Sequence, residues 1–247
     1  MIELTGLTRR RGRVRVVDDL TCTIRPGRVT GLLGPNGAGK SSTMRMIVGL
    51  DRPTSGEATV QGRPYHALRE PLRTVGAQLD PAEARSGLTA HAHLRALAAT
   101  HRIPRRRIDT VLGIVGLDGV AGRRVHTFSL GMTQRLAVAA ALLGDPPVLL
   151  FDEPVNGLDP DGVRWLRGFL RGLADSGRTV LLSSHLIREL EDTADHVVVL
   201  GRGRLLADAP VHELVAGSGS LEAAYLALTG GAVDHRAGHH PERWEYR

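Results

Sequence analysis

Residues 34–42 read Gly34-Pro35-Asn36-Gly37-Ala38-Gly39-Lys40-Ser41-Ser42, directly after the apolar run Val29–Leu33. Positions 34–41 have the spacing Gly-x-x-x-x-Gly-Lys-Ser, and the residues from Lys40 to Val48 are expected to form a helix that Gly49 ends. Glycines at a strand-to-helix turn let backbone N–H groups face phosphate oxygens, and the helix N-terminus adds positive potential. The stretch therefore predicts a P-loop in which residues 34–42 bind the phosphates of a nucleoside triphosphate.

Lys40 and Ser41 carry the chemistry of this loop. In a P-loop the lysine reaches the β- and γ-phosphates and the serine hydroxyl binds Mg²⁺, so ATP and Mg²⁺ are the expected ligands. Lys40 is the single lysine in a chain whose lysines and arginines total 32. A compact ammonium fits a tight backbone cradle that a planar guanidinium does not fit. The alternative is a glycine-rich turn without a ligand, and the strand, helix and lysine in register argue against it.

The composition indicates a globular protein that stays in the cytoplasm. Apolar residues make up 42% of the 247, which is enough for a buried core. No apolar run reaches the ~18 residues that cross a bilayer, and Met1–Leu4 lacks the layout of a signal peptide. Cys22 is the only cysteine, as expected in a reducing compartment, and it lies in an alternating apolar stretch typical of a core.

The net charge of +6 leaves nucleic acid or an anionic membrane surface open as partners. The basic runs are short, at residues 9–11, 105–107 and 123–124, and no aromatic residues interleave with them as a stacking platform requires. We interpret them as solvated surface and expect no nucleic-acid partner.

The first 80 residues read mainly as short strands. Ile2–Leu4 and Leu20–Ile24 precede the P-loop, and Ala58–Val60 and Thr74–Ala77 follow its helix. We predict that these segments form an N-terminal antiparallel β subdomain joined to the nucleotide-binding core.

A helical insertion is expected over about residues 80–145. Its helices are predicted from Thr89, as N-cap, to about His101, over 105–115 and over 133–143. Strands and helices then alternate as strand 148–151, helix 162–173, strand 179–183, helix 186–190 and strand 197–200, followed by a last helix over 220–228. This alternation predicts an α/β fold with a mostly parallel sheet, of the P-loop NTPase type. Residues 231–247 are expected to be a mobile tail.

Two carboxylates end the apolar strand 148–151. Asp152 and Glu153 should reach the carboxyl edge of the sheet, where the phosphates also lie. Asp152 suits the magnesium shell, and Glu153 suits the polarisation of an attacking water. Alone, such a pair might only end a strand, but beside a P-loop the catalytic interpretation is favoured.

From Ile2 to about Gly230 the chain resembles an ATP-binding cassette (ABC) ATPase. Gln78 resembles the glutamine of the Q-loop, which in that family links Mg²⁺ and water to the membrane partner. His185, after Ser183-Ser184, resembles the switch histidine on the γ-phosphate. A solvated glutamine and a structural histidine are the plain alternatives, and the order and spacing of all the motifs favour the resemblance.

Two further segments carry the resemblance. Phe128–Arg135 resembles the signature motif and keeps Ser129 and Gly131, but it departs from the commonest Leu-Ser-Gly-Gly-Gln form at Leu130 and Met132. Asn156-Gly157-Leu158-Asp159 resembles the D-loop, so Asp159 is implied as a nucleotide-site residue. A helix N-cap at Ser129 and a turn at Asn156-Gly157 are the alternatives.

The family places an aromatic residue on adenine near the N-terminus, and this chain has none before Tyr65. Arg11 occupies the matching position, and a guanidinium can stack on a base. We therefore predict that Arg11 or Val17 contacts adenine; the alternative is a solvated Arg11 and a weakly held base.

The resemblance implies a motor. Two cassettes would face each other head to tail, with Ser129 and Gly131 of one closing on the γ-phosphate held by Lys40 of the other. Glu153, His185, Lys40 and Gln78 would be catalytic, and Ser41, Gln78 and Asp152 would hold the metal.

The residues 220–230 and the Ser-Leu-Gly-Met signature are similar to the motor subunits of drug and antibiotic exporters. A separate transmembrane permease is then the partner, docked in the groove between Gln78 and the helical insertion at the inner face of the membrane. The alternatives are a soluble ABC ATPase acting on ribosomes or nucleic acid, and a regulatory module that binds ATP without hydrolysing it.

Overall fold

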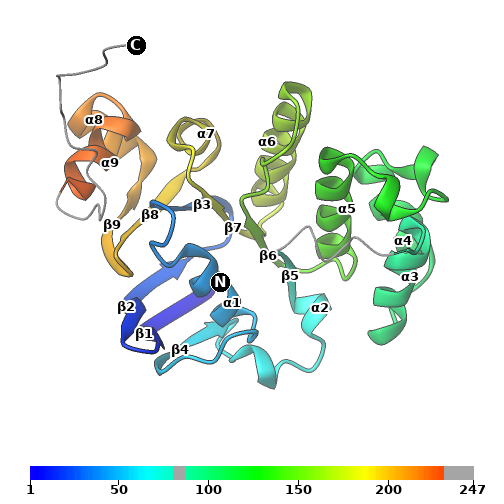
Figure 1. Ribbon diagram of the computed structural model, residues 1–247, viewed down its shortest axis with the longest axis horizontal. Coiled ribbons are helices and arrows are strands. Elements are labelled where there is room, and N and C mark those ends of the chain that lie inside the picture. Colours follow the sequence, from blue (N-terminus) through cyan, green and yellow to red (C-terminus); the bar gives the residue numbers. More distant parts are fainter. Residues whose placement is uncertain (80–86, 231–247) are drawn as a thin grey trace, which may run out of the picture.

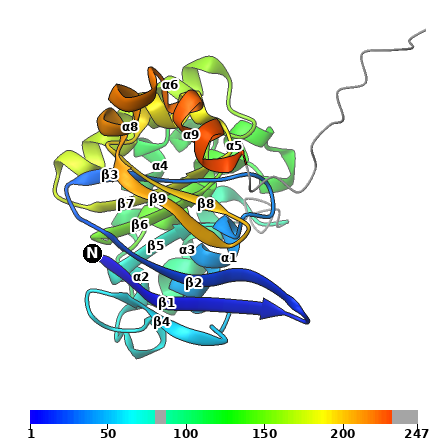
Figure 2. The same ribbon diagram turned by 90° about the vertical axis from the view of Figure 1, so that its left-hand side faces the viewer.

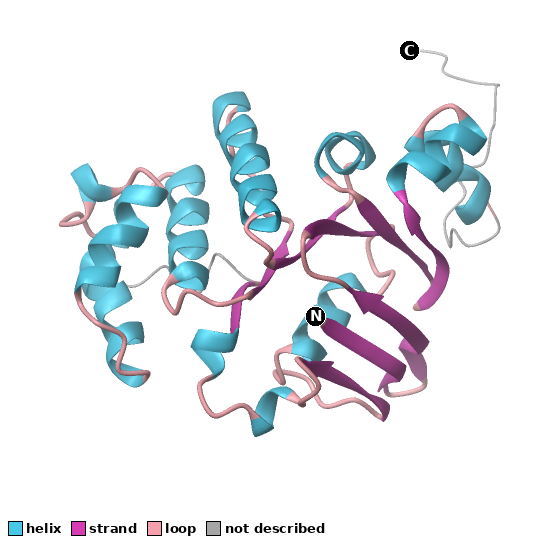
Figure 3. Cartoon of the chain, turned by 180° about the vertical axis from the view of Figure 1, so that it is seen from behind, coloured by secondary structure: helices cyan, strands magenta, loops and turns pink. Residues whose placement is uncertain are grey.

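The computed structural model describes residues 1–79 and 87–230. Two sheets and a group of helices make up the molecule, with α3, α4 and α5 gathered at one end and the N-terminal strands at the other (Figure 1; Figure 3, from behind). No helix in these ranges combines the length and apolar character needed to cross a bilayer. The predicted mobile tail, 231–247, lies outside the described residues.

The smaller sheet is antiparallel, in the order β2-β1-β4. Its strands are β1 (Ile2–Arg11), β2 (Val14–Ile24) and β4 (Ser55–Val60). The prediction of an N-terminal antiparallel sheet is confirmed, although β1 and β2 form a longer hairpin than the sequence indicated. Figure 2 shows this sheet lying beneath the larger one.

The larger sheet has the order β5-β6-β7-β3-β8-β9 and is parallel except for β9. Its strands in chain order are β3 (Arg28–Leu33), β5 (Val75–Gln78), β6 (Val148–Asp152), β7 (Thr179–Ser184), β8 (His196–Gly201) and β9 (Arg204–Pro210). The predicted α/β fold with a mostly parallel sheet is confirmed.

One strand assignment was wrong. The segment 74–77 was predicted in the antiparallel subdomain, but Thr74 ends a helical turn and β5 is the edge strand of the parallel sheet, paired with β6. The reason is packing, because a Cβ on Gly76 would lie 1.9 Å from the carbonyl oxygen of Ala141. This glycine lets the helix that contains Ala141 cover the strand directly, a contact that local sequence does not report.

The helices are α1 (Lys40–Ile47), α2 (Pro71–Thr74), α3 (Ala90–Thr100), α4 (Arg106–Ile114), α5 (Leu130–Leu142), α6 (Pro160–Asp175), α7 (Ile187–Thr193), α8 (Val211–Ser218) and α9 (Leu221–Thr229). The sequence did not indicate α2, β9 or α8. Helix α5 begins three residues before the predicted Thr133 because Ser129 caps it, accepting a hydrogen bond from Met132 N at 3.2 Å.

Alternate residues of the central strands face two cores. Leu32 and Leu150 pack with Met44 and Ile47 of α1 and with the antiparallel sheet. Leu33 and other residues of the opposite strand faces pack with α5, α6 and α7. Because both faces of the strands are covered, the strands are apolar throughout, and their carboxyl ends meet α1 and its loop at one edge.

Candidate active site

The loop between β3 and α1 adopts a conformation that only glycine tolerates at two positions. Gly37 and Gly39 have φ angles of 83° and 103°. A Cβ on Gly39 would lie 2.5 Å from Val16 O, and one on Gly34 would lie 2.6 Å from Leu200 O. The loop is therefore pressed against β2 and β8, with its backbone turned toward the start of α1.

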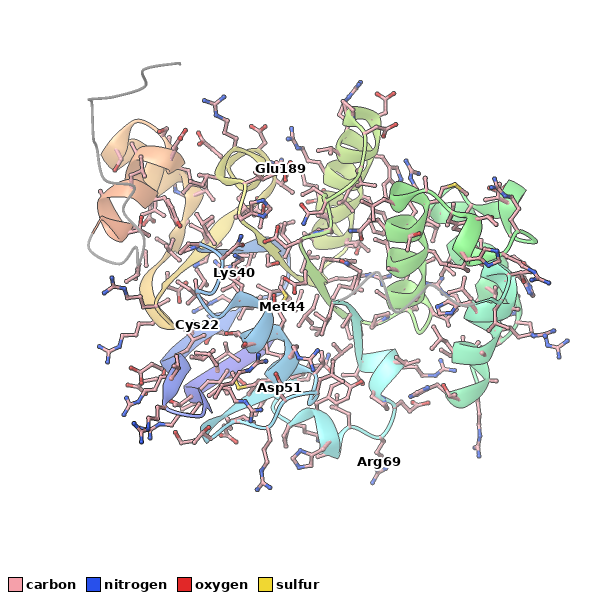
Figure 4. All side chains as sticks on the ribbon, in the orientation of Figure 1. Cys22, Lys40, Met44, Asp51, Arg69 and Glu189 are labelled. Carbon is pink, nitrogen blue, oxygen red and sulfur yellow. The ribbon has the colours of Figure 1, made fainter. Side chains whose placement is uncertain are left out.

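Lys40 is nearly buried at the start of α1 and lies near the middle of the molecule (Figure 4). Its Nζ donates to the carbonyl oxygens of Gly34 at 2.7 Å and Pro35 at 3.4 Å. Burial lowers the pKa of this ammonium from its ordinary value, against the opposing effect of Glu153 and Asp152. The loop thus holds a desolvated cation at its centre, which favours an anionic ligand.

Glu153 lies between this cation and a histidine. One carboxylate oxygen lies 3.7 Å from Lys40 Nζ, and the other shares a 2.6 Å hydrogen bond with His185 Nδ1. The Glu153 backbone N–H donates to Ser183 Oγ at 2.9 Å, and that hydroxyl in turn donates to Asp152. The structure therefore brings together three of the four residues predicted to be catalytic.

Ser183 was not identified from the sequence. It stands opposite Asp152 in the pairing of β6 with β7, and its hydroxyl contacts both acidic residues of the site. The signal available in the sequence was a serine at the end of a mostly apolar strand, the strand that follows the one ending in Asp152 and Glu153.

Gln78, the fourth predicted catalytic residue, is 2% exposed and sits beside Asp152. Its Nε2 donates to Asp152 O and to Gln134 Oε1, each at 3.3 Å. A backbone carbonyl only accepts, so this contact fixes which end of the amide is the nitrogen. The Oε1 of Gln78 is buried and has no hydrogen-bond partner within residues 1–79 and 87–230.

A cavity of about 440 Å³ opens over the loop, the start of α1 and the side chains of Glu153 and His185. Its lining residues are Arg11, Val16, Asn36, Gly37, Gly39, Lys40, Ser41, Ser42, Glu153, Asn156 and His185. Of the other loop residues, Gly34 and Ala38 are buried and Pro35 is half-buried. They do not line the cavity and instead lie on the side of the loop that faces the protein.

The prediction that Val17 contacts adenine was wrong. Val17 is fully buried and belongs to the core beneath the antiparallel sheet, whereas Val16, its neighbour on the other face of β2, lines the cavity. Arg11 lines the cavity too, and its Nη2 lies 3.6 Å from Asp51 Oδ2. Alternation along β2 allows only one of the two valines to face a ligand.

Ser129, Gly131 and Asp159 do not line the cavity of their own chain. Ser129 caps α5, and Asp159 caps α6 by accepting from Gly162 N at 2.7 Å. Ser129 is exposed, so it is accessible to another molecule.

The oxygen donors near Asp152 suit a hard divalent cation. The Oε1 of Gln78 has no hydrogen-bond partner in the described part of the chain, Asp152 adds a carboxylate that accepts from Ser183, and Ser41 lines the cavity. No group of three or more His, Cys, Asp or Glu side chains within the described ranges could hold a metal alone. Mg²⁺ is compatible with this set because it takes few protein ligands and completes its shell with phosphates and water.

These features define a P-loop nucleotide-binding site. A family model described as ABC transporter matches residues 17–156, which is more than half of the chain. The chain belongs to the ABC transporter family, as its resemblance implied.

Similar proteins carry transport names. The bacitracin transport ATP-binding protein BcrA of Bacillus licheniformis is 40% identical over 217 residues, covering 87% of this chain and 71% of that protein. The lantibiotic transport ATP-binding protein SrtF of Streptococcus pyogenes is 33% identical, covering 84% of this chain and 90% of its own length.

Solved structures share the fold. A structure described as the ATP binding subunit of an ABC transporter matches with a TM-score of 0.81 and 28% identity, covering 93% of this chain and 99% of the other. A dimeric ATP-binding cassette in a post-hydrolysis state, bound to ADP and Pi, has a TM-score of 0.76 at 24% identity, covering 85% of this chain and 98% of the other.

Proposed function

We propose that this chain is the motor subunit of an exporter, which closes as a dimer on Mg²⁺-ATP and drives a separate transmembrane permease. The observation that carries the proposal is the Glu153 carboxylate, held between the ammonium of Lys40 and the ring of His185. All three side chains line one cavity, which supports the roles of base, phosphate-binding cation and orienting group for Glu153, Lys40 and His185.

Hydrolysis follows from these positions. The loop amides and Lys40 hold the β- and γ-phosphates, so the terminal phosphate lies toward Glu153. Glu153 accepts a hydrogen bond from the attacking water, and His185 orients the carboxylate through its Nδ1–H. A doubly protonated His185 would also donate its Nε2–H toward the developing charge. Bound Mg²⁺, held by Ser41, Asp152 and Gln78, would neutralise phosphate charge.

The second cassette supplies the missing side of the site. Ser129 and Gly131 lie at the start of α5, away from the cavity of their own chain, where exposed N–H groups and the helix N-terminus favour an anion. In a head-to-tail dimer they close on the γ-phosphate of the partner's ATP, with Asp159 nearby.

The permease has a groove to dock in, between Gln78 and the helical insertion. A cavity of about 460 Å³ there is lined by Arg45, Val48, Leu50, Tyr65, Leu72, Val75, Ala77, Gln78, Leu79, His93, Leu97, Ala137, Ala140 and Ala141. The lining is mainly apolar and fits one apolar helix face of a membrane protein. Docking there places the chain on the cytoplasmic face of the membrane.

Export is favoured by the relatives, since two of them are named for bacitracin and lantibiotic transport. The rival function, a soluble ATPase on ribosomes or nucleic acid, finds no support among these names.

The test is to purify the tagged chain from detergent-solubilised cells and to identify the proteins retained with it. We expect a polytopic membrane protein, lost when Leu97→Asp places a charge in the groove, while Leu226→Asp on the exposed face of α9 keeps it. Retention of ribosomal protein or nucleic acid in a salt-dependent way, without a membrane protein, would overturn the proposal.

A further inference from the structure

Glu153 occupies a strained backbone conformation. Its φ angle of 50° lies in the left-handed region, which costs a non-glycine residue about 1–3 kcal/mol. Such a residue keeps its conformation only when its surroundings determine it. The contacts that hold residues 152–156, here called the catalytic turn, therefore decide where the Glu153 carboxylate points.

Two buried glutamine amides hold the turn from one side. Gln78 donates to Asp152 O at 3.3 Å, and Gln134 of α5 donates to Asn156 O at 3.0 Å. Within the turn, Asn156 N donates to Glu153 O at 3.2 Å. The two amides thus bind the carbonyl groups on either side of Glu153.

The amides also bind each other. Gln134 Oε1 accepts from Gln78 Nε2, and the two side chains are 3% and 2% exposed. Each amide orientation is dictated by a backbone carbonyl, so the network has one arrangement. Hydrogen bonds in such a buried network restrict its members. Three of the four amide atoms are paired, and Gln78 Oε1 has no partner within the described residues.

A third contact joins the same elements. Leu130, at the start of α5, lies over Gly157, because a Cβ on Gly157 would come within 2.1 Å of Leu130 Cδ2. Leu130 is where the chain departs from the commonest signature motif. The polar and apolar contacts together fasten α5, which packs against β5 at one side of the parallel sheet (Figure 1), to the catalytic turn.

We propose that Gln134 is a positioning residue for ATP hydrolysis: it holds the catalytic turn through Asn156 O and so fixes the Glu153 carboxylate beside Lys40 and His185. This inference rests on the proposed role of Glu153 as the base. Gln134 does not line the cavity, and it acts through the turn. A displacement of α5 moves the base, because the same helix begins at the signature residue Ser129.

The test compares Gln134→Met, which keeps the length of the side chain and removes both hydrogen bonds, with Thr133→Val. Thr133 is the adjacent buried polar residue, and among the residues that the structure describes its hydroxyl donates to the carbonyl oxygen of Ser129, the N-cap of the same helix. Loss of about one buried hydrogen bond from the turn predicts a kcat roughly tenfold lower in Gln134→Met. The KM and Kd for ATP should stay within about twofold of the original values in both variants.

A second readout does not depend on activity. Hydrogen exchange of the nucleotide-free protein should quicken at the amides of Glu153 and residues 155–158 in Gln134→Met and stay unchanged in Thr133→Val. Gln134→Asn, which keeps the amide but is too short to span both partners, should behave like Gln134→Met, and it serves if the methionine variant folds poorly.

The inference and the proposed function can fail separately. If Glu153→Gln hydrolyses ATP at the original rate, Glu153 is not the base, and the proposed function fails. If Glu153→Gln is inactive while Gln134→Met keeps the original kcat and exchange rates, Glu153 keeps its role and Gln134 has none. A loss of kcat that Thr133→Val shares equally, with no selective change in exchange at the turn, also overturns the positioning role.

Discussion

The Glu153 carboxylate and the His185 ring share a 2.6 Å hydrogen bond across the carboxyl ends of β6 and β7. The two residues are 32 positions apart in the chain, and the parallel pairing of the strands brings them together. The opposite carboxylate oxygen faces Lys40, so the base is oriented from two sides before nucleotide enters.

Glu153→Gln should lose at least about a hundredfold in kcat, because an amide cannot accept a proton from the attacking water. The variant keeps the shape of the side chain and removes a negative charge near the phosphates, so ATP binding should be retained. A dimer should accumulate with ATP in size-exclusion chromatography. A turnover close to the original rate would contradict the catalytic assignment.

Lys40→Ala and Lys40→Arg should both weaken ATP binding by at least roughly tenfold in calorimetry, corresponding to the loss of one charge-assisted contact. The arginine variant keeps the charge, and it fails because the nearly closed loop around Gly34 O has no room for a planar group. Unchanged affinity in the alanine variant would mean that the loop does not grip the triphosphate.

Arg11→Ala should weaken ATP binding several-fold while leaving the binding of inorganic triphosphate unchanged, because Arg11 lines the cavity and is predicted to stack on the base. Arg10→Ala, at the exposed neighbouring position, is the matched control. If Arg11→Ala has no effect and Arg11→Tyr raises the affinity, the guanidinium does not stack on adenine.

Gly76→Ala should lower the free energy of unfolding by at least about 2 kcal/mol, because its Cβ would collide with the backbone of Ala141 at 1.9 Å. Gly113→Ala is the matched control on α4, where a Cβ meets nothing within 4 Å. That change should raise the free energy of unfolding by about 0.5–1 kcal/mol. Equal effects of the two changes, measured by urea denaturation, would contradict the assigned packing of β5.

Cys22 gives a pH-dependent prediction. Burial raises the pKa of its thiol from 9.0 to about 12, and Figure 4 places it at the antiparallel sheet. The folded state thus holds the proton more tightly than the unfolded state, so the stabilisation is intact below pH 9 and is lost as the pH rises toward 12.

Between pH 7.5 and pH 10 the free energy of unfolding should fall by about 1 kcal/mol more for the original protein than for Cys22→Ala. Thiol reagents should label Cys22 at pH 8 only as fast as the protein unfolds. Rapid labelling of the folded protein would show that the thiol is accessible.

Features that depend on a few consecutive residues were predictable from the sequence. The spacing of residues 34–41 follows from what a phosphate cradle requires, and the apolar run before Asp152 and Glu153 follows from burial on both faces of a parallel strand. The cap at Thr89 is of the same kind, since its hydroxyl accepts from Ala92 N at 3.1 Å as its sequence context predicted.

The tertiary structure decided what depends on residues far apart in the chain. Whether Val16 or Val17 faces the ligand depends on which side of β2 the core covers, and a stretch of adjacent valines contains no such information. The sheet to which β5 belongs depends on the fit of Gly76 against α5. The contact between Gln78 and Gln134, 56 positions apart, arises only when a helix of the insertion packs beside the sheet.

The sequence by itself specifies the groups that do chemistry, because each is tied to a local motif. The positions of these groups are decided by the tertiary structure. The atoms that orient Glu153 belong to strands and helices that come into contact only when the core is assembled.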